Sequence, residues 1–301
     1  MIRRRAIRKI FITTLSLFII LTVSTITNFK DTLSVNVQLE DVTNLTNGCV
    51  YLLNDKGYLV RKNIFIDSNN ITDSIRKVIN YLKINNDEKY SSNFIGTIPS
   101  TCILNDLLYD EGYVTLNFSK SFLDNNNIDI CVSSIVYSIY ALGDVEGITI
   151  LVDDSYLDGY PKIIKKDIDI NKESFLTSRE DITKVVIYYL MNDNFEYYYV
   201  PVTKYLNDSR DKINIIVDQL ASNTSYDLVS LVNSNIELIN SYEENDMMVL
   251  NFNNYLFDSD NKVLEEVLYC ISYSVFDNYD VDMVMVEVDG KNIYSIDRKS
   301  L

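Results

Sequence analysis

The chain has 301 residues, of which 43 are acidic and 27 basic, so its formal net charge at pH 7 is −16. An acidic surface of this kind repels nucleic acid and anionic lipid, and nucleic-acid binding is therefore excluded. We interpret most of the charge as solvated surface; attraction of a basic partner is the alternative. The chain contains no histidine, which removes the usual metal ligand, the usual general base and every Ser-His or Cys-His nucleophile.

The first thirty residues have the pattern of a membrane anchor. An uncharged run over residues 10–26 follows a basic flank made of Arg3, Arg4, Arg5, Arg8 and Lys9. As a helix this run would be about 26 Å long, near the lower limit for a hydrocarbon core of about 30 Å. The basic flank places the N-terminus in the cytoplasm and the chain after Asn28 outside. A signal peptide is the alternative, but residues 23–27 lack an Ala-x-Ala cleavage pattern, which favours an uncleaved single-pass anchor.

Residues 50–152 are repeated, loosely, at 188–288. The block Tyr51-Leu52-Leu53-Asn54-Asp55 returns at 189–193, and Leu116-Asn117-Phe118 returns at 250–252. Solenoid repeats have periods of roughly 20 to 50 residues, so a much longer period indicates two tandem copies of a whole domain. Each copy is long enough to bury its own core.

Each copy is predicted to begin with a β-hairpin, which spans 50–66 in the first copy and 184–200 in the second. Pro201 follows the second hairpin and favours an edge strand, because proline donates no backbone hydrogen bond. A helix with one apolar face comes next, at 71–82 and 213–220. A second hairpin, a second helix at 128–142 or 264–275, and a closing strand at 148–152 or 284–288 complete each copy.

This order of elements predicts an α+β fold, with two helices packed on one face of a sheet of about five strands. The predicted organisation is a cytoplasmic tip and transmembrane helix at 1–30, a stalk at 31–47, a first domain at 48–162, a linker at 163–182 and a second domain at 183–298. Four cysteines, Cys49, Cys102, Cys131 and Cys270, have unrelated spacings and are predicted to be small buried hydrophobes. A Cys49–Cys102 disulfide is left open.

Four short motifs resemble those of the GerM domain family, whose name refers to sporulation and germination. They are Tyr199-Val200-Pro201-Val202, Ile98-Pro99-Ser100, Leu116-Asn117-Phe118-Ser119 and Val288-Asp289-Gly290. Each copy departs from the pattern once, with Arg61-Lys62-Asn63-Ile64 in place of the proline element and Val232-Asn233-Ser234 in place of Ile-Pro-Ser. The resemblance implies two mixed α/β, ring-building-motif-like domains that assemble an extracytoplasmic complex in sporulation or germination.

No catalytic site, cofactor or metal site is predicted. Asp153-Asp154 and Asp289-Gly290 follow strands and are interpreted as turns, because a calcium loop needs more oxygen ligands at alternating positions. The candidate interaction surface is formed by Tyr197, Tyr198 and Tyr199, which must place at least one ring on each face of a strand. Packing within a strand pair is the alternative explanation for these rings.

The resulting hypothesis is a membrane-anchored scaffold without enzymatic activity, located in the cell membrane. Its partners would be other envelope or membrane proteins, and it would form a homo-oligomer or part of a ring. Binding of cell-wall glycan or peptidoglycan through the tyrosines is the alternative. Glycoside hydrolysis by two facing carboxylates is the third hypothesis.

Overall fold

The computed structural model describes residues 45–84, 93–193, 196–222, 227–258 and 262–300. The predicted anchor at 10–26 lies outside these residues. Within the described ranges, none of the helices has the length and apolar character needed to cross a membrane. All of the described residues belong to one compact unit, Asn44–Leu301.

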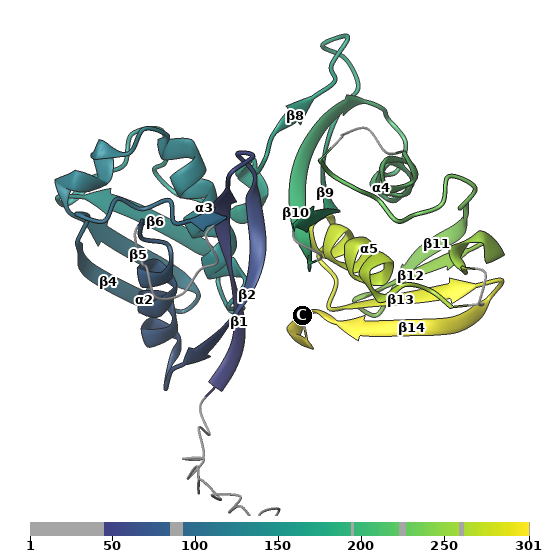
Figure 1. Ribbon diagram of the computed structural model, residues 1–301, viewed down its shortest axis with the longest axis horizontal. Coiled ribbons are helices and arrows are strands. Elements are labelled where there is room, and N and C mark those ends of the chain that lie inside the picture. Colours follow the sequence, from purple (N-terminus) through teal and green to yellow (C-terminus); the bar gives the residue numbers. More distant parts are fainter. Residues whose placement is uncertain (1–44, 85–92, 194–195, 223–226, 259–261, 301) are drawn as a thin grey trace, which may run out of the picture. The chain divides into compact units, whose positions relative to one another are not determined.

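The first copy follows the predicted order of elements (Figure 1). Its elements are β1 (Leu45–Asn54), β2 (Leu59–Asp67), α2 (Ile71–Tyr81), β3 (Phe94–Ile95), β4 (Leu104–Asp110), β5 (Tyr113–Phe118), the 3-10 helix η1 (Lys120–Asp124), α3 (Ile128–Tyr140), β6 (Gly147–Val152) and β7 (Ser155–Tyr156). Asn70 caps α2, because its side chain accepts a hydrogen bond from the Asp73 N–H.

The segment between the copies contains η2 (Lys165–Asp167) and β8 (Glu173–Ser174). The second copy then repeats the first with β9 (Ile182–Asp193), β10 (Glu196–Asn207), α4 (Lys212–Ala221), β11 (Leu238–Glu244), β12 (Met247–Phe252), η3 (Asn254–Leu256), α5 (Glu265–Asn278), β13 (Met283–Val288) and β14 (Lys291–Asp297), and η4 (Arg298–Ser300) ends the described chain.

Each copy has its own four-stranded sheet, in the order β4-β5-β6-β7 or β11-β12-β13-β14. The two inner strands of each sheet are parallel, because the helix α3 or α5 returns the chain to the same end of the sheet. The opening hairpins do not join these sheets. They combine in a third sheet with the order β3-β1-β2-β10-β8, in which β9 also pairs with β10.

The prediction that both helices lie on one face of a single sheet is therefore wrong. In each copy the helices lie between the opening hairpin and the four-stranded sheet (Figure 1). Helix α3 shows the physical reason, since every residue from Cys131 to Ile139 is buried. A helix that is buried all round needs an apolar surface on both sides, and one sheet covers only one of them.

The edge position predicted for Pro201 is also wrong. Strand β10 pairs with β9 along one side, and on its other side it meets β2 at Arg61 and β8 at Glu173. Pro201 lies between these two contacts, so its strand is an inner strand.

The four cysteines are free and buried, as predicted for residues that pack in the core. The Cys49–Cys102 disulfide is not formed.

Candidate interaction site at the junction of the two copies

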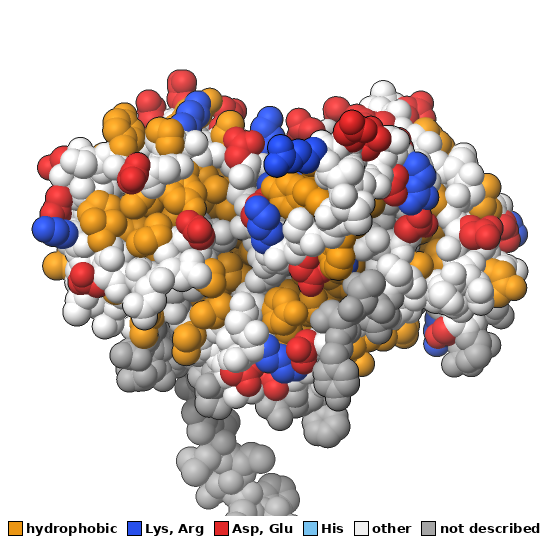
Figure 2. Space-filling model, turned by 90° about the horizontal axis from the view of Figure 1, so that it is seen from above, with side chains coloured by type: hydrophobic (Ala, Val, Ile, Leu, Met, Phe, Trp, Pro, Cys, Tyr) orange, Lys and Arg blue, Asp and Glu red, His pale blue; other side chains and the backbone are white. Residues whose placement is uncertain are grey.

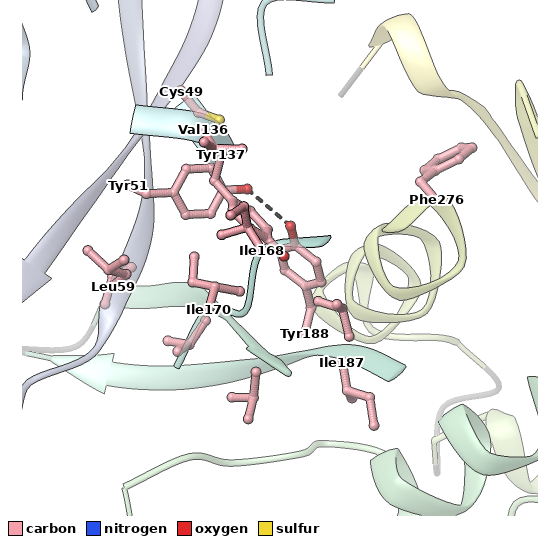
Figure 3. Packing of buried hydrophobic residues seen from close by; sticks show 14 of the residues in the cluster. Cys49, Tyr51, Leu59, Val136, Tyr137, Ile168, Ile170, Ile187, Tyr188 and Phe276 are labelled. Carbon is pink, nitrogen blue, oxygen red and sulfur yellow. Dashed lines mark hydrogen bonds between the residues drawn. The ribbon is translucent and has the colours of Figure 1, made fainter. Parts of the chain in front are cut away.

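Two equivalent tyrosines meet where the opening hairpins face each other. The Tyr51 N–H donates a hydrogen bond to Ser138 Oγ of α3, and the Tyr188 N–H donates one to Ser274 Oγ of α5, both at 2.9 Å. The hydroxyl oxygens of the two tyrosines are 3.1 Å apart and share a hydrogen bond (Figure 3). Contact between equivalent residues is the mark of an approximate two-fold axis within the chain.

The sequence alignment is wrong by one position at this strand. It pairs Tyr51 with Tyr189, whereas the hydrogen bonds to the helix serines pair Tyr51 with Tyr188. Adjacent residues of a strand point to opposite faces, so this shift changes which ring is assigned to the junction. Because Tyr188 and Tyr189 are adjacent and identical, the sequence does not show which of them is equivalent to Tyr51.

A second pair of equivalent tyrosines packs against the first, one on each side. Tyr137 contacts Tyr51 with ring centroids 5.4 Å apart, and Tyr273 contacts Tyr188 at 5.1 Å. Each outer ring also carries a cation over its face, Lys165 at 4.7 Å from Tyr137 and Arg61 at 4.6 Å from Tyr273. Both cations therefore interact with the negative face of an aromatic ring, in addition to their polar partners.

An ion pair at the junction joins the connecting segment to the second copy. Lys165 forms an ion pair with Asp277 of α5, and the Tyr188 hydroxyl donates to the other carboxylate oxygen of Asp277 at 2.9 Å. Burial raises the pKa values of Tyr51, Tyr137 and Tyr188 well above 10. The three hydroxyls therefore stay protonated to a higher pH than an exposed tyrosine does, and the Tyr188 hydroxyl keeps its proton for the bond to Asp277.

The segment between the copies takes part in the same junction. Asn171 Nδ2 donates to the carbonyls of Leu59 and Pro201, and Asn171 Oδ1 accepts from the Leu59 N–H, all at 2.8 Å. The Thr203 N–H donates to the Ile170 carbonyl, also at 2.8 Å. These bonds replace the strand partner that Pro201 lacks. Ile168 and Ile170 lie beside the tyrosine pair (Figure 3).

Asp169 lies in that segment and has three partners. Lys172 and Lys184 approach its carboxylate at 2.8 and 2.9 Å, and the Tyr205 hydroxyl donates to it at 2.8 Å. Burial by itself raises the pKa of Asp169, but the hydrogen bonds from these groups outweigh burial and lower the pKa below its usual value.

The three tyrosines of the candidate interaction surface divide between the two faces of β10. Tyr199 packs on α5, with ring centroids 5.3 Å from Tyr273, while Tyr198 packs edge-on against Phe94 of β3 at 5.0 Å. Burial, together with a hydrogen bond to Glu196, raises the pKa of Tyr198 to about 12. Tyr197 is 44% exposed, and it offers more free ring surface than its two neighbours.

The family motifs at the strand ends have structural roles. Asn251 Oδ1 accepts a hydrogen bond from the Gly290 N–H at 3.0 Å, and Asn117 Oδ1 accepts one from the Asp154 N–H at 3.2 Å. Asp289 and Gly290 both have positive φ, at 49° and 74°, as a tight hairpin turn requires. These residues form turns, as predicted. Among the residues that the structure describes, no cluster of three or more acidic or cysteine side chains is suited to a metal ion.

The charged part of the junction was not found by sequence reasoning. Arg61 belongs to the segment that departs from the family's proline element, and Lys165 and Asn171 belong to a segment interpreted only as a linker. Asp277 lies on α5 one turn after Tyr273. The signal available in the sequence was an aromatic residue at the equivalent position of each copy. The polar contacts of the junction, however, join residues that are 30 to more than 100 positions apart.

The arrangement defines a class of protein: two α+β domains of one fold joined through a shared sheet and an ordered connecting segment. Comparison with known proteins identifies the family. The profile described as "Germane: Sporulation and spore germination" matches residues 49–158 and 186–294. The chain belongs to this family, and the resemblance to GerM domains is confirmed.

Two comparisons, one with a protein sequence and one with a solved structure, find similarity over most of the chain. The spore germination protein GerM of Bacillus subtilis (strain 168) is 25% identical over 267 residues, which cover 81% of this chain and 71% of that protein. The solved structure of the tandem GerMN domains of the sporulation protein GerM from Bacillus subtilis has a TM-score of 0.73 and 22% identity, and covers 82% of this chain and 92% of that one. The second likeness establishes the shared tandem fold.

Proposed function

We propose that the chain is a membrane-anchored, extracytoplasmic scaffold without enzymatic activity that helps to assemble an envelope complex of sporulation or germination. The observation that carries this proposal is the junction. Two domains that share a sheet, a buried tyrosine pair and an interdomain ion pair present their outer surfaces at a fixed spacing. A fixed spacing between two surfaces is what a scaffold requires and what a flexible pair of binding modules lacks.

Three further observations support the parts of this proposal. The basic flank and apolar run at 3–26 supply an anchor and its orientation. The chain has no histidine, and the names of its relatives refer to no reaction. Wide areas of hydrophobic side chains lie between scattered acidic ones, most clearly over the first copy (Figure 2). The exposed apolar residues of this copy include Ile103 and Leu123, at 61% and 49%. Exposed apolar areas of this kind suit contacts with other proteins.

The experiment is photo-crosslinking of the full-length chain in its native host. A photoreactive residue replaces Tyr197, and a matched control replaces Asp158, an exposed loop residue. We expect the Tyr197 variant to crosslink to other envelope proteins. The chain should stay in the membrane fraction after a carbonate wash, and protease added from outside should reach both copies. Release by carbonate, protection from external protease, or equal crosslinking from both positions would contradict the proposal.

Binding of cell-wall glycan is the second candidate, because Tyr197 presents an exposed ring on one face of β10 and Tyr198 a partly exposed ring on the other. Sedimentation of the full-length chain with purified peptidoglycan separates the two functions. If glycan binding is the function, Tyr197→Ala and Tyr198→Ala abolish sedimentation and Tyr156→Ala does not. Equal sedimentation of all three variants would rule out this binding mode.

A further inference from the structure

The sheet of the second copy has one face that no described element covers. Helices α4 and α5 lie on the other face (Figure 1). One row of paired residues across the uncovered face is Tyr242, Val249, Met285 and Ser295, and the next row is Glu244, Met247, Met283 and Asp297. We call Tyr242, Met247, Val249, Met283 and Met285 the methionine face. It holds three of the six methionines in the chain.

The methionine face is apolar and lies outside the core. Met248 and Leu250 belong to the core cluster, so Val249 between them points to the opposite side of the sheet. Val249 is nevertheless only 1% exposed, while Tyr242 is 45% exposed and Met283 and Met285 are partly exposed. The solvent-accessible part of this face is therefore formed by Tyr242 and the methionines, whose long flexible side chains adapt to a partner.

The same face of the first copy has a different composition. The pairing of strands places Leu108, Thr115 and Thr149 in one row, where the second copy has Tyr242, Val249 and Met285. Tyr113 and Gly147 stand where the second copy has Met247 and Met283. Threonine in place of valine and methionine makes the first copy's face more polar. The fold does not demand the methionine face, because the first copy is built without it.

Acidic side chains border the methionine face. Glu244 and Asp297 end one of its rows, and Glu287 lies in the next row beyond Met285. None of these three carboxylates takes part in an ion pair within the described ranges. An apolar centre with this border repels a second copy of itself and attracts apolar surface that carries positive charge.

The size of the face favours a short segment over a folded domain. Strands are about 4.8 Å apart and same-face residues of a strand about 7 Å apart, so two rows on four strands cover on the order of 250 Å². A stable interface between folded proteins buries about 800 Å² on each partner. We propose that the methionine face is a docking surface for a short segment of another protein, whose apolar side chains are flanked by lysine or arginine. The proposal rests on the scaffold role above.

The test measures binding of a labelled probe peptide to the full-length chain by fluorescence anisotropy. The probe has leucine on one face of a helix and lysine on the other. We expect Tyr242→Lys with Met285→Lys to weaken binding by at least about tenfold, as loss of central contacts does in other interfaces. The matched control is Leu108→Lys with Thr149→Lys, which changes the net charge equally at the equivalent positions of the first copy and should alter binding by less than about twofold.

A milder pair guards against loss of folding. Val249→Thr with Met285→Thr installs the residues of the first copy, and it should weaken binding while circular dichroism shows an intact fold. Equal effects of the two lysine pairs, or no effect of the threonine pair, would show binding to net charge alone and overturn the proposal. Sedimentation velocity adds a third outcome, because self-association that Met285→Lys abolishes would make the face a contact between copies of this chain and would also overturn it. Crosslinking from Tyr197 does not involve this face, so the scaffold role is tested independently.

Discussion

Asn171 is the side chain that completes the junction where backbone pairing fails. It forms three hydrogen bonds with Leu59 and Pro201, and it has a positive φ of 46°, which asparagine tolerates better than most residues. We expect Asn171→Ala to lower the free energy of unfolding by about 1–3 kcal/mol, because buried backbone groups lose their partners. Urea denaturation measures this loss.

Asn171→Gly separates the two contributions. Glycine accepts the positive φ without strain but makes no side-chain hydrogen bond. If the hydrogen bonds are the main contribution, the glycine variant loses nearly as much stability as the alanine variant. Full stability of the glycine variant would mean that only backbone conformation matters at this position.

Tyr188 makes the junction sensitive to alkali. Burial raises its pKa well above 10, so the unfolded chain releases this proton at a lower pH than the folded chain does. Stability is therefore complete below about pH 10 and declines as the pH rises above that value. We expect Tyr188→Phe to be less stable at pH 8, because it loses the bonds to Tyr51 and Asp277, and to lose less further stability between pH 8 and 11.

The control for the alkaline effect is Tyr156→Phe, since Tyr156 is 68% exposed. Urea denaturation at several pH values should give this variant the same pH dependence as the unchanged chain. An unchanged slope for Tyr188→Phe would show that its hydroxyl does not contribute to alkaline unfolding.

At the scale of elements, helix α5 closes the free edge of β9 with its serine and asparagine side chains. Ser274 Oγ accepts from the Tyr188 N–H, and Asn278 bonds both the N–H and the carbonyl of Val186. Helix α3 does the same for β1, through Ser138 and Ser134 on the backbone of Tyr51. Polar residues within an apolar helix thus satisfy strand edges that would otherwise be unpaired.

Two serines of α5 give a matched comparison. Ser274 and Ser272 are both fully buried, but Ser272 Oγ has no hydrogen-bond partner among the residues that the structure describes. We expect Ser274→Ala to lower the free energy of unfolding by about 1–3 kcal/mol, and Ser272→Ala to be neutral or slightly stabilising. Thermal and urea unfolding of both variants check this difference, and equal losses would contradict it.

The order of helices and strands was accessible from sequence because each depends on its own local pattern. Ile75, Val78 and Ile79 form the buried stripe of α2, and Ile213, Ile216 and Val217 form that of α4, as predicted. The sheet to which the hairpins belong was not accessible, because Tyr51 and Tyr188 meet across 137 residues. A sequence shows that a strand exists but not which distant edge it meets.

The placement of the tyrosines of β10 on two faces was accessible from sequence for the same reason, while their role as an interaction surface stays a prediction. Alternation along a strand requires Tyr198 and Tyr199 to point to opposite faces, and they do. Their partners, Phe94 and Tyr273, come from different copies and follow no sequence period. The all-round burial of α3 did have a signal, since Cys131 to Val136 contains no charged residue, but a one-face interpretation of the helix overlooked it.

At the scale of the whole molecule, duplication has produced one body with two different outer surfaces. The equivalent tyrosines meet at the junction, whereas the outer sheet faces carry threonine in one copy and methionine in the other. The contacts at the junction limit which residues both copies can have there. The outer faces make no such contacts, so their residues can differ between the copies. Two joined domains with two distinct outer surfaces are the arrangement that follows, and this arrangement suits the scaffold role proposed above.

This arrangement predicts that the two copies unfold together. The chain has no tryptophan, so a single tryptophan placed in one copy reports on that copy alone. Tyr109 and Phe257 are partly buried positions in the first and second copies, respectively, and suit Tyr109→Trp and Phe257→Trp. Because the shared sheet and the Lys165–Asp277 pair link the copies, we expect both reporters to give the same urea midpoint and the same slope.

Weakening the junction should separate the two transitions. Asp277→Ala with Asn171→Gly removes the interdomain ion pair and the bonds to Leu59 and Pro201, while each copy keeps its own four-stranded sheet and helices. In this background the two tryptophan reporters should show different midpoints, since each copy then unfolds with its own stability. Different midpoints already in the unchanged junction would show that the copies are independent, and the proposed scaffold role would lose the observation that carries it.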